Sequence, residues 1–75
     1  MFGMTREMVN EVKKEYPPGV TVQLVYTRDI KHPIAIGSEG KVIKVDDIGT
    51  IHVKWENGQK IGIIYGEDTI RIVQR

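Results

Sequence analysis

Apolar side chains recur at every second position through most of the chain after Gly19, and turn-forming residues interrupt this pattern at short intervals. The clearest example is residues 51–55, where three apolar side chains alternate with His52 and Lys54. Alternation with a period of two places successive side chains on opposite faces of a β-strand. This pattern predicts a chain built mainly of half-buried strands that are joined by tight turns.

Five such segments can be counted between Val20 and the end of the chain. The predicted strands are residues 20–26, 40–45, 50–56, 60–65 and 70–73. Asn57-Gly58 predicts a two-residue type I′ hairpin turn, and Gly49 suits a positive φ at the end of the preceding turn. Five short strands in about 55 residues predict a small SH3-like antiparallel barrel over residues 20–75. Closure of a barrel also removes the exposed sheet edges.

The segment before the first strand has helical periodicity, and we predict a helix over residues 5–15. The Thr5 hydroxyl can cap the first turn, and Pro17-Pro18-Gly19 ends the helix because proline lacks the backbone N–H. Its apolar stripe consists of Met4, Met8, Val9, Val12 and Tyr16. We expect this stripe to dock across an open end of the barrel. The alternative is a stripe that binds a second subunit or a partner.

Residues 27–38 form a predicted loop of about a dozen residues, which is long for so small a domain. A loop of this length is often functional or mobile. The alternative is that Ile34 and Ile36 anchor it to the core. We also expect the glycines, Gly40 and Gly62 among them, to serve turns and bends and not a phosphate-binding loop.

Length and composition limit the class of protein. The chain has 75 residues, enough for one domain, and no cysteine, so disulfides and thiolate-bound metals are excluded. Its 11 Lys and Arg residues against 10 Asp and Glu residues give a net charge of +1, which argues against a dedicated nucleic-acid binder. No segment approaches the roughly 20 apolar residues that span a bilayer. We therefore expect a cytoplasmic protein without a membrane segment.

No residue pattern indicates catalysis. His32 and His52 are the two histidines, and Ser38 is the single serine, without the sequence context of a nucleophile. Adjacent residues of a strand point to opposite faces, so Asp46 and Asp47 are a poor chelate for a cation. We expect a protein that is not an enzyme and that holds neither a metal nor another cofactor.

The first functional hypothesis is a module that binds a protein or a peptide, because aromatic side chains on a barrel can form a shallow peptide groove. The candidate contact residues are Tyr26, Arg28, Ile34, Trp55 and Tyr65. Trp55 shares a strand face with Ile51 and Val53, so the alternative is that its ring belongs to the core. We expect a monomer or a weak homodimer.

The second hypothesis is a nucleic-acid-binding module. If Val42 faces the core, four basic or imidazole side chains form a stripe across two neighbouring strands. These candidate residues are Lys41, Lys44, His52 and Lys54, with help from Arg28 and Lys31. Basic groups beside aromatic rings can follow a phosphate backbone. The alternative is an ordinary solvated face.

Several runs together resemble a known family. Residues 16–25, 40–42, 45–58 and 62–68 resemble the domain-of-unknown-function family 4314, and residues 3–7 fit its beginning. The resemblance covers essentially the whole chain. It implies a small bacterial or phage-associated protein with an SH3-like fold, and it adds no catalytic residue.

A shorter resemblance concerns residues 53–58, followed by Gly66 and Asp68. These residues are similar to the signature of the SH3-like domains of the Mind bomb/HERC2 type, which recognise peptides of partner proteins. The shared positions fall on the hairpin turn and the barrel corners, so a common architecture is the other explanation. The chain lacks the aromatic-rich loop that those domains carry before their second strand.

Overall fold

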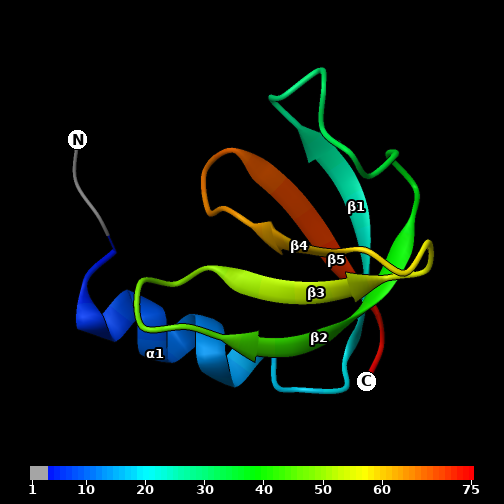
Figure 1. Cartoon of the computed structure of the whole chain (residues 1–75). Coiled ribbons are helices and arrows are strands. Elements are labelled where there is room, and N and C mark those ends of the chain that lie inside the picture. Colours follow the sequence, from blue (N-terminus) through cyan, green and yellow to red (C-terminus); the bar gives the residue numbers. More distant parts are fainter. Residues whose placement is uncertain (1–3) are drawn as a thin grey trace.

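The computed structural model describes residues 4–75, and it contains one helix followed by five antiparallel strands in a single sheet. The elements are α1 (Arg6–Glu15), β1 (Thr21–Thr27), β2 (Glu39–Val45), β3 (Ile51–Trp55), β4 (Lys60–Ile63) and β5 (Asp68–Gln74). The strand order is β4-β3-β2-β1-β5, and the sheet is strongly curved (Figure 1). The predicted helix and the five antiparallel strands are therefore confirmed.

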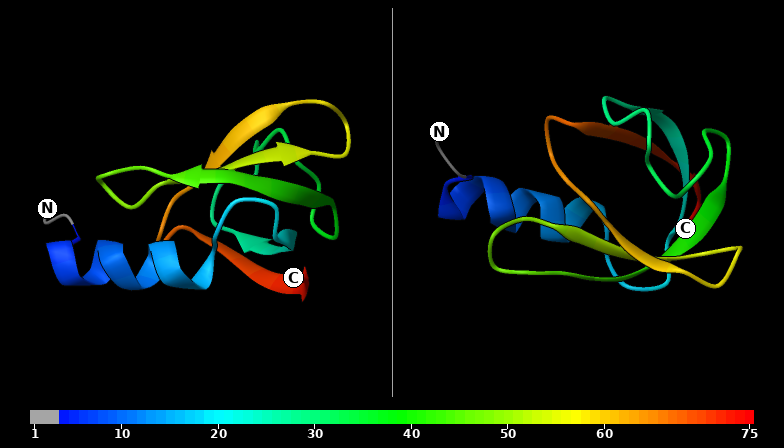
Figure 2. Two further views of the ribbon diagram at one scale, coloured as in Figure 1. Left: turned by 90° about the horizontal axis from the view of Figure 1, so that it is seen from below. Right: turned by 45° about the horizontal axis from the view of Figure 1, so that its top comes forward.

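The predicted closure into a barrel is not found, because β4 and β5 are the two edges of the sheet. The curvature brings β4 and β5 toward each other (Figures 1 and 2), but no register of paired residues joins them. The sheet is open between these two strands. This opening contributes to the site described below.

Local contacts explain why α1 begins and ends where it does. The backbone N–H of Met8 donates to the Thr5 hydroxyl at 3.1 Å, which caps the first turn as predicted. The helix lies along β2 (Figure 2), and the Lys13 ammonium donates to the Asp47 carboxylate in the β2–β3 turn at 3.0 Å. Val9 and Val12 are buried, whereas Met8 is 39% exposed. The apolar stripe is thus docked on one flank and open on the other.

The core lies on the concave face of the sheet, where alternate strand residues point inward and α1 covers one side. Its buried side chains are Val12, Val20, Val22, Leu24, Ile34, Val42, Ile51, Val53, Trp55 and Ile63. This alternation is the period-two pattern read from the sequence. Val42 faces inward, as the basic-stripe hypothesis required.

Tyr26 departs from the predicted alternation. The sequence placed it on the same face as Val22 and Leu24, but its side chain is 54% exposed. The register between β1 and β5 shifts between Leu24 and Tyr26, so one extra residue enters β1 at this point. A bulge of this kind turns the following side chain to the other face.

The sequence predicted a type I′ hairpin turn at Asn57-Gly58, and this prediction is wrong. A type I′ turn needs a positive φ at both central residues, and Gly58 has a φ of 89° while no non-glycine residue in the described part has a positive φ. The Trp55 N–H donates to the Gln59 carbonyl, and the Gly58 N–H donates to the Trp55 carbonyl, both at 2.8 Å. The connection is therefore the three-residue loop 56–58, which ends in a left-handed glycine.

Partly buried and exposed polar contacts hold the long loop between β1 and β2 and the turn between β4 and β5. The Thr27 hydroxyl donates to the Asp68 carboxylate at 2.6 Å, and the Ile64 N–H donates to its other oxygen at 3.0 Å. His32 Nδ1 accepts the Ile34 N–H at 3.1 Å, and the Ile34 side chain is buried. The loop is thus anchored to the core and to the β4–β5 turn.

The anchoring expectation was correct for only one of the two isoleucines in this loop. Ile34 is buried, but Ile36 is 61% exposed and contributes little to the core.

Candidate functional site

One concave surface of the molecule runs between α1, the end of β4 and the start of β5. It consists of two adjoining hollows of about 260 Å³ and about 370 Å³, and both are lined by Val12, Glu15 and Tyr65. The other residues of the first hollow are Tyr16, Gly49, Ile51, Ile63, Gly66, Asp68, Thr69 and Ile70. The second hollow adds Met4, Glu7, Met8 and Glu11. We call this continuous surface the α1–β4 groove.

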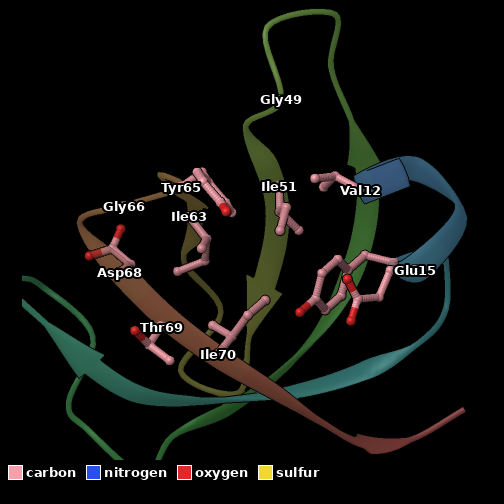
Figure 3. Close-up of a pocket in the computed structure, with 11 residues that line it drawn as sticks. Val12, Glu15, Gly49, Ile51, Ile63, Tyr65, Gly66, Asp68, Thr69 and Ile70 are labelled. Carbon is pink, nitrogen blue, oxygen red and sulfur yellow. The ribbon is translucent and has the colours of Figure 1, made fainter. Parts of the chain in front are cut away.

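The floor of the groove is apolar and its outer parts are exposed. Figure 3 shows Ile51, Ile63 and Ile70 at the floor, with Tyr65 and Glu15 on opposite sides. Tyr65 is 64% exposed. An exposed aromatic ring above an apolar floor is typical of sites that bind a ligand or a peptide.

The helical side of the groove carries carboxylates. Glu7 and Glu11 line the second hollow, and Glu15 lines both. Burial raises the pKa of the Tyr16 hydroxyl, and the nearby Glu15 carboxylate raises it further. The helical side of the groove thus presents three carboxyl side chains and no basic one.

Two of the predicted peptide contacts lie in the core and not at the surface. Trp55 and Ile34 are each 2% exposed. The Trp55 indole N–H donates to the Ile61 carbonyl at 3.0 Å, so the ring is tied to β4. Side chains buried to this extent contribute packing and are not available to a partner on the surface.

The other three predicted peptide contacts are exposed, but only one of them belongs to the groove. Tyr65 lines both hollows. Tyr26 pairs with Thr69 across β1 and β5, and the Arg28 N–H donates to the Glu67 carbonyl at 3.0 Å. Tyr26 and Arg28 therefore lie at the end of β1, beside the β4–β5 turn and outside the groove.

The predicted basic residues come together on the outer face of the sheet. Lys41 pairs with Lys54 across β2 and β3, and Lys54 pairs with Lys60 across β3 and β4. Lys44 pairs with His52 in the neighbouring row. We call these five residues the basic face. Like charges directly opposite each other are destabilising, and no ion pair of these lysines occurs within residues 4–75.

His52 differs from the lysines of this face because its imidazole has a partner. Its Nε2 atom lies 2.8 Å from the Asp46 carboxylate. The hydrogen bond with His52 holds the pKa of Asp46 below its usual 3.8, burial opposes this shift, and the backbone N–H groups of Thr50 and Ile48 add to it. The local role of Asp46 is to stabilise the turn that joins β2 to β3.

This pair predicts an effect on acid stability. The folded-state pKa of Asp46 is lowered, so its contribution to stability is present above about pH 3.8 and is lost as the pH falls through the lower folded value. Asp46→Asn should therefore make the urea midpoint less dependent on pH between about pH 5 and about pH 2. Glu56→Gln, at an exposed position, is the control. Identical pH profiles for Asp46→Asn and the unchanged chain would contradict this role.

The described residues were also compared with the requirements of a metal site and of a membrane-spanning helix. No group of three His, Asp or Glu side chains within residues 4–75 is arranged to hold a metal ion. The one helix of this part, α1, lacks the length and the apolar character needed to cross a membrane.

The fold and the groove define a small, mainly β domain with one N-terminal helix and an apolar groove whose helical side is acidic. Residues 5–73 match the family model described as Domain of unknown function (DUF4314). The chain belongs to this family, as its motifs predicted. None of the curated proteins compared with the chain matches it. Because the family description assigns no function, the function has to be inferred from the geometry.

Most of the groove has no signal in the sequence. Its apolar helical residues were recognised as a stripe, but the residues facing them come from the β4–β5 connection, about 50 positions further along the chain. The one signal in the sequence was the spacing of Glu7, Glu11 and Glu15 beside that stripe.

Proposed function

We propose that the chain is a small SH3-like interaction module that binds a protein or peptide segment in the α1–β4 groove. The observation that carries this proposal is Tyr65, whose 64% exposed ring stands above an apolar floor between a helix and an open sheet edge. Tyrosine rings in such positions are frequent anchors of interfaces. The proposal takes the chain to act in the bacterial cytoplasm as a monomer or weak homodimer, without a cofactor or a catalytic residue.

The groove replaces the surface favoured by the sequence. That surface needed Ile34 and Trp55 to be accessible, and both are buried. The groove keeps Tyr65 from the earlier set and adds Met8, which is 39% exposed and has the flexible, polarisable side chain common at adaptable binding surfaces.

The test is an affinity pull-down of the tagged chain from bacterial lysate with nuclease, repeated with two variants. We expect a discrete protein partner that Tyr65→Ala loses and Tyr26→Ala keeps, since both variants remove an exposed tyrosine ring but only one lies in the groove. Loss of an interface anchor costs about 2 kcal/mol or more, which corresponds to roughly thirtyfold weaker binding. A partner lost with Tyr26→Ala and kept with Tyr65→Ala would move the site to the end of β1.

The basic face supports a second candidate, nucleic-acid binding. The specific observation is the row of Lys41, Lys54 and Lys60, which are direct neighbours on three adjacent strands without a carboxylate partner in residues 4–75. A phosphate backbone would relieve the repulsion among these charges, and binding would then weaken steeply as salt rises.

Fluorescence anisotropy with labelled single-stranded and duplex oligonucleotides tests this second candidate. Lys54→Glu should abolish binding, and Lys14→Glu on α1 is the matched control because it makes the same charge change away from the basic face. Binding that does not depend on salt, or an equal loss in the two variants, would rule out the basic face.

A further inference from the structure

The acidic residues of the groove form a regular row. Glu7, Glu11 and Glu15 follow one another at intervals of four residues, so they lie on one side of α1 with a spacing of about 6 Å along its axis. All three are exposed, and none of them forms an ion pair within residues 4–75. Carboxylates spaced in this way can each accept hydrogen bonds from a separate positively charged side chain.

The lining of the groove differs in charge from the outer face of the sheet. The described residues that line the groove include four carboxyl groups, namely Glu7, Glu11 and Glu15 on α1 and the inward-bonded Asp68, and they include no Lys, Arg or His. The lysines of the basic face lie on the outer side of the sheet. The groove is therefore locally acidic in a chain whose net charge is +1.

The apolar part of the groove lies beside this row of carboxylates. Met8 and Val12 come from the same helix as the glutamates, and Tyr65 faces them from the β4–β5 connection. A ligand that fits both parts needs apolar side chains for the space between Met8 and Tyr65 and cationic side chains for the row of glutamates.

We propose, on the basis of the function above, that the occupant of the α1–β4 groove is a cationic peptide segment of a partner protein. Its Lys or Arg side chains pair with Glu7, Glu11 and Glu15, and its apolar side chains pack between Met8 and Tyr65. Charge-assisted hydrogen bonds of this kind are stronger than neutral ones, and complementary charge raises the association rate and rejects acidic partners. An extended segment with a cationic side chain at every second residue has a repeat of about 6.6 Å, close to the spacing of the carboxylates.

The experiment uses the full chain as bait for a random peptide library displayed on phage. Enriched peptides are synthesised with a fluorescent label, and their affinities are measured by anisotropy for the unchanged chain and for three variants. We expect peptides with net positive charge whose binding is lost with Tyr65→Ala and weakened roughly tenfold by Glu11→Lys. Glu56→Lys makes the same charge change outside the groove and should leave the affinity unchanged.

The possible failures are distinct. Enriched peptides that depend on Tyr65 but are neutral or acidic would overturn the cationic occupant and leave the proposed function standing. An equal effect of Glu11→Lys and Glu56→Lys would do the same. The absence of any peptide that depends on Tyr65 would overturn the proposed function itself. Sedimentation tests a further outcome. If the chain associates with itself and Glu11→Lys abolishes this association, the occupant of the groove is the basic face of a second copy, and the proposal of a partner peptide is overturned.

Discussion

Replacing Gly40 by alanine should destabilise the domain by roughly 3 kcal/mol, although the change adds only one methyl group. Gly40 is buried in β2 and pairs with Trp55 of β3. A Cβ atom at this position would stand 2.7 Å from the Lys54 carbonyl oxygen, 2.7 Å from Val53 Cγ1 and 2.9 Å from the Trp55 Cα. The Lys54 oxygen and the Trp55 Cα belong to the backbone of β3, so the methyl group can be accommodated only if the two strands move apart.

Urea unfolding followed by far-ultraviolet circular dichroism measures this effect. Gly62→Ala is the matched control, because Gly62 also lies inside a strand and its added Cβ would meet the Thr50 methyl group at 2.7 Å, with the nearest backbone atom at 3.9 Å. Rotation of the Thr50 side chain about χ1 can move this methyl group away, and alanine also restricts the unfolded chain, so the loss of stability should be much smaller. Equal midpoints for Gly40→Ala and the unchanged chain would contradict the close approach of β2 and β3.

The same two glycines show where sequence reasoning ends. We expected both at turns and bends, but they lie inside β2 and β4. Neither has a positive φ, so the backbone conformation does not explain why glycine occupies these two positions. The reason is the proximity of a neighbouring strand, which depends on the register of the whole sheet and has no local signature.

The elements themselves could be predicted because their signals are local. The capping hydroxyl of Thr5, the apolar spacing of α1 and the alternation in residues 51–55 act over a few positions, and the structure places α1 and β3 there. Closure of the sheet could not be predicted in this way. It requires β4 and β5 to pair with each other. In the turn that joins them, the Ile64 N–H donates to the Asp68 carboxylate, and the N–H groups of Glu67 and Asp68 donate to the Ile64 carbonyl.

Two errors have the same origin, an extra residue that shifts the register between strands. The shift after Leu24 turns Tyr26 outward, and the three-residue loop 56–58 replaces the two-residue turn. Propensity alone favoured the two-residue turn at Asn57-Gly58. The pairing of Trp55 with Gln59, which places the indole in the core, favours the longer loop.

The candidate sites depended on tertiary structure to different degrees. Four of the five members of the basic face were predicted, because they lie on neighbouring strands. Alternation accounts for Lys41, His52 and Lys54, whereas the register shift between Val42 and Lys44 turns Lys44 to the same face, and the pairing with β4 adds Lys60. The groove joins α1 to the β4–β5 connection, and no pattern within either segment indicates the other. A site of this kind becomes visible only when the sheet curves.

Replacing Trp55 by alanine should bring the domain close to unfolding. The ring is 2% exposed, and removing a buried tryptophan side chain costs about 3–5 kcal/mol. A domain of this size has a free energy of unfolding of order 5 kcal/mol, so little stability would remain. The change also removes the indole N–H that donates to the Ile61 carbonyl at 3.0 Å and links β3 to β4.

The dispersion of amide signals in a proton–nitrogen correlation spectrum reports whether the Trp55→Ala chain is folded. Trp55→Phe is the control, because it keeps most of the buried ring and should lose only about 1–2 kcal/mol with the missing hydrogen bond. A Trp55→Ala chain that stays folded and loses a partner would return Trp55 to the binding surface. Since Trp55 is the single tryptophan, the fluorescence of the unchanged chain independently reports whether its indole lies in the core or at the surface. A core indole emits at short wavelength and resists quenching by acrylamide, whether or not the groove is occupied.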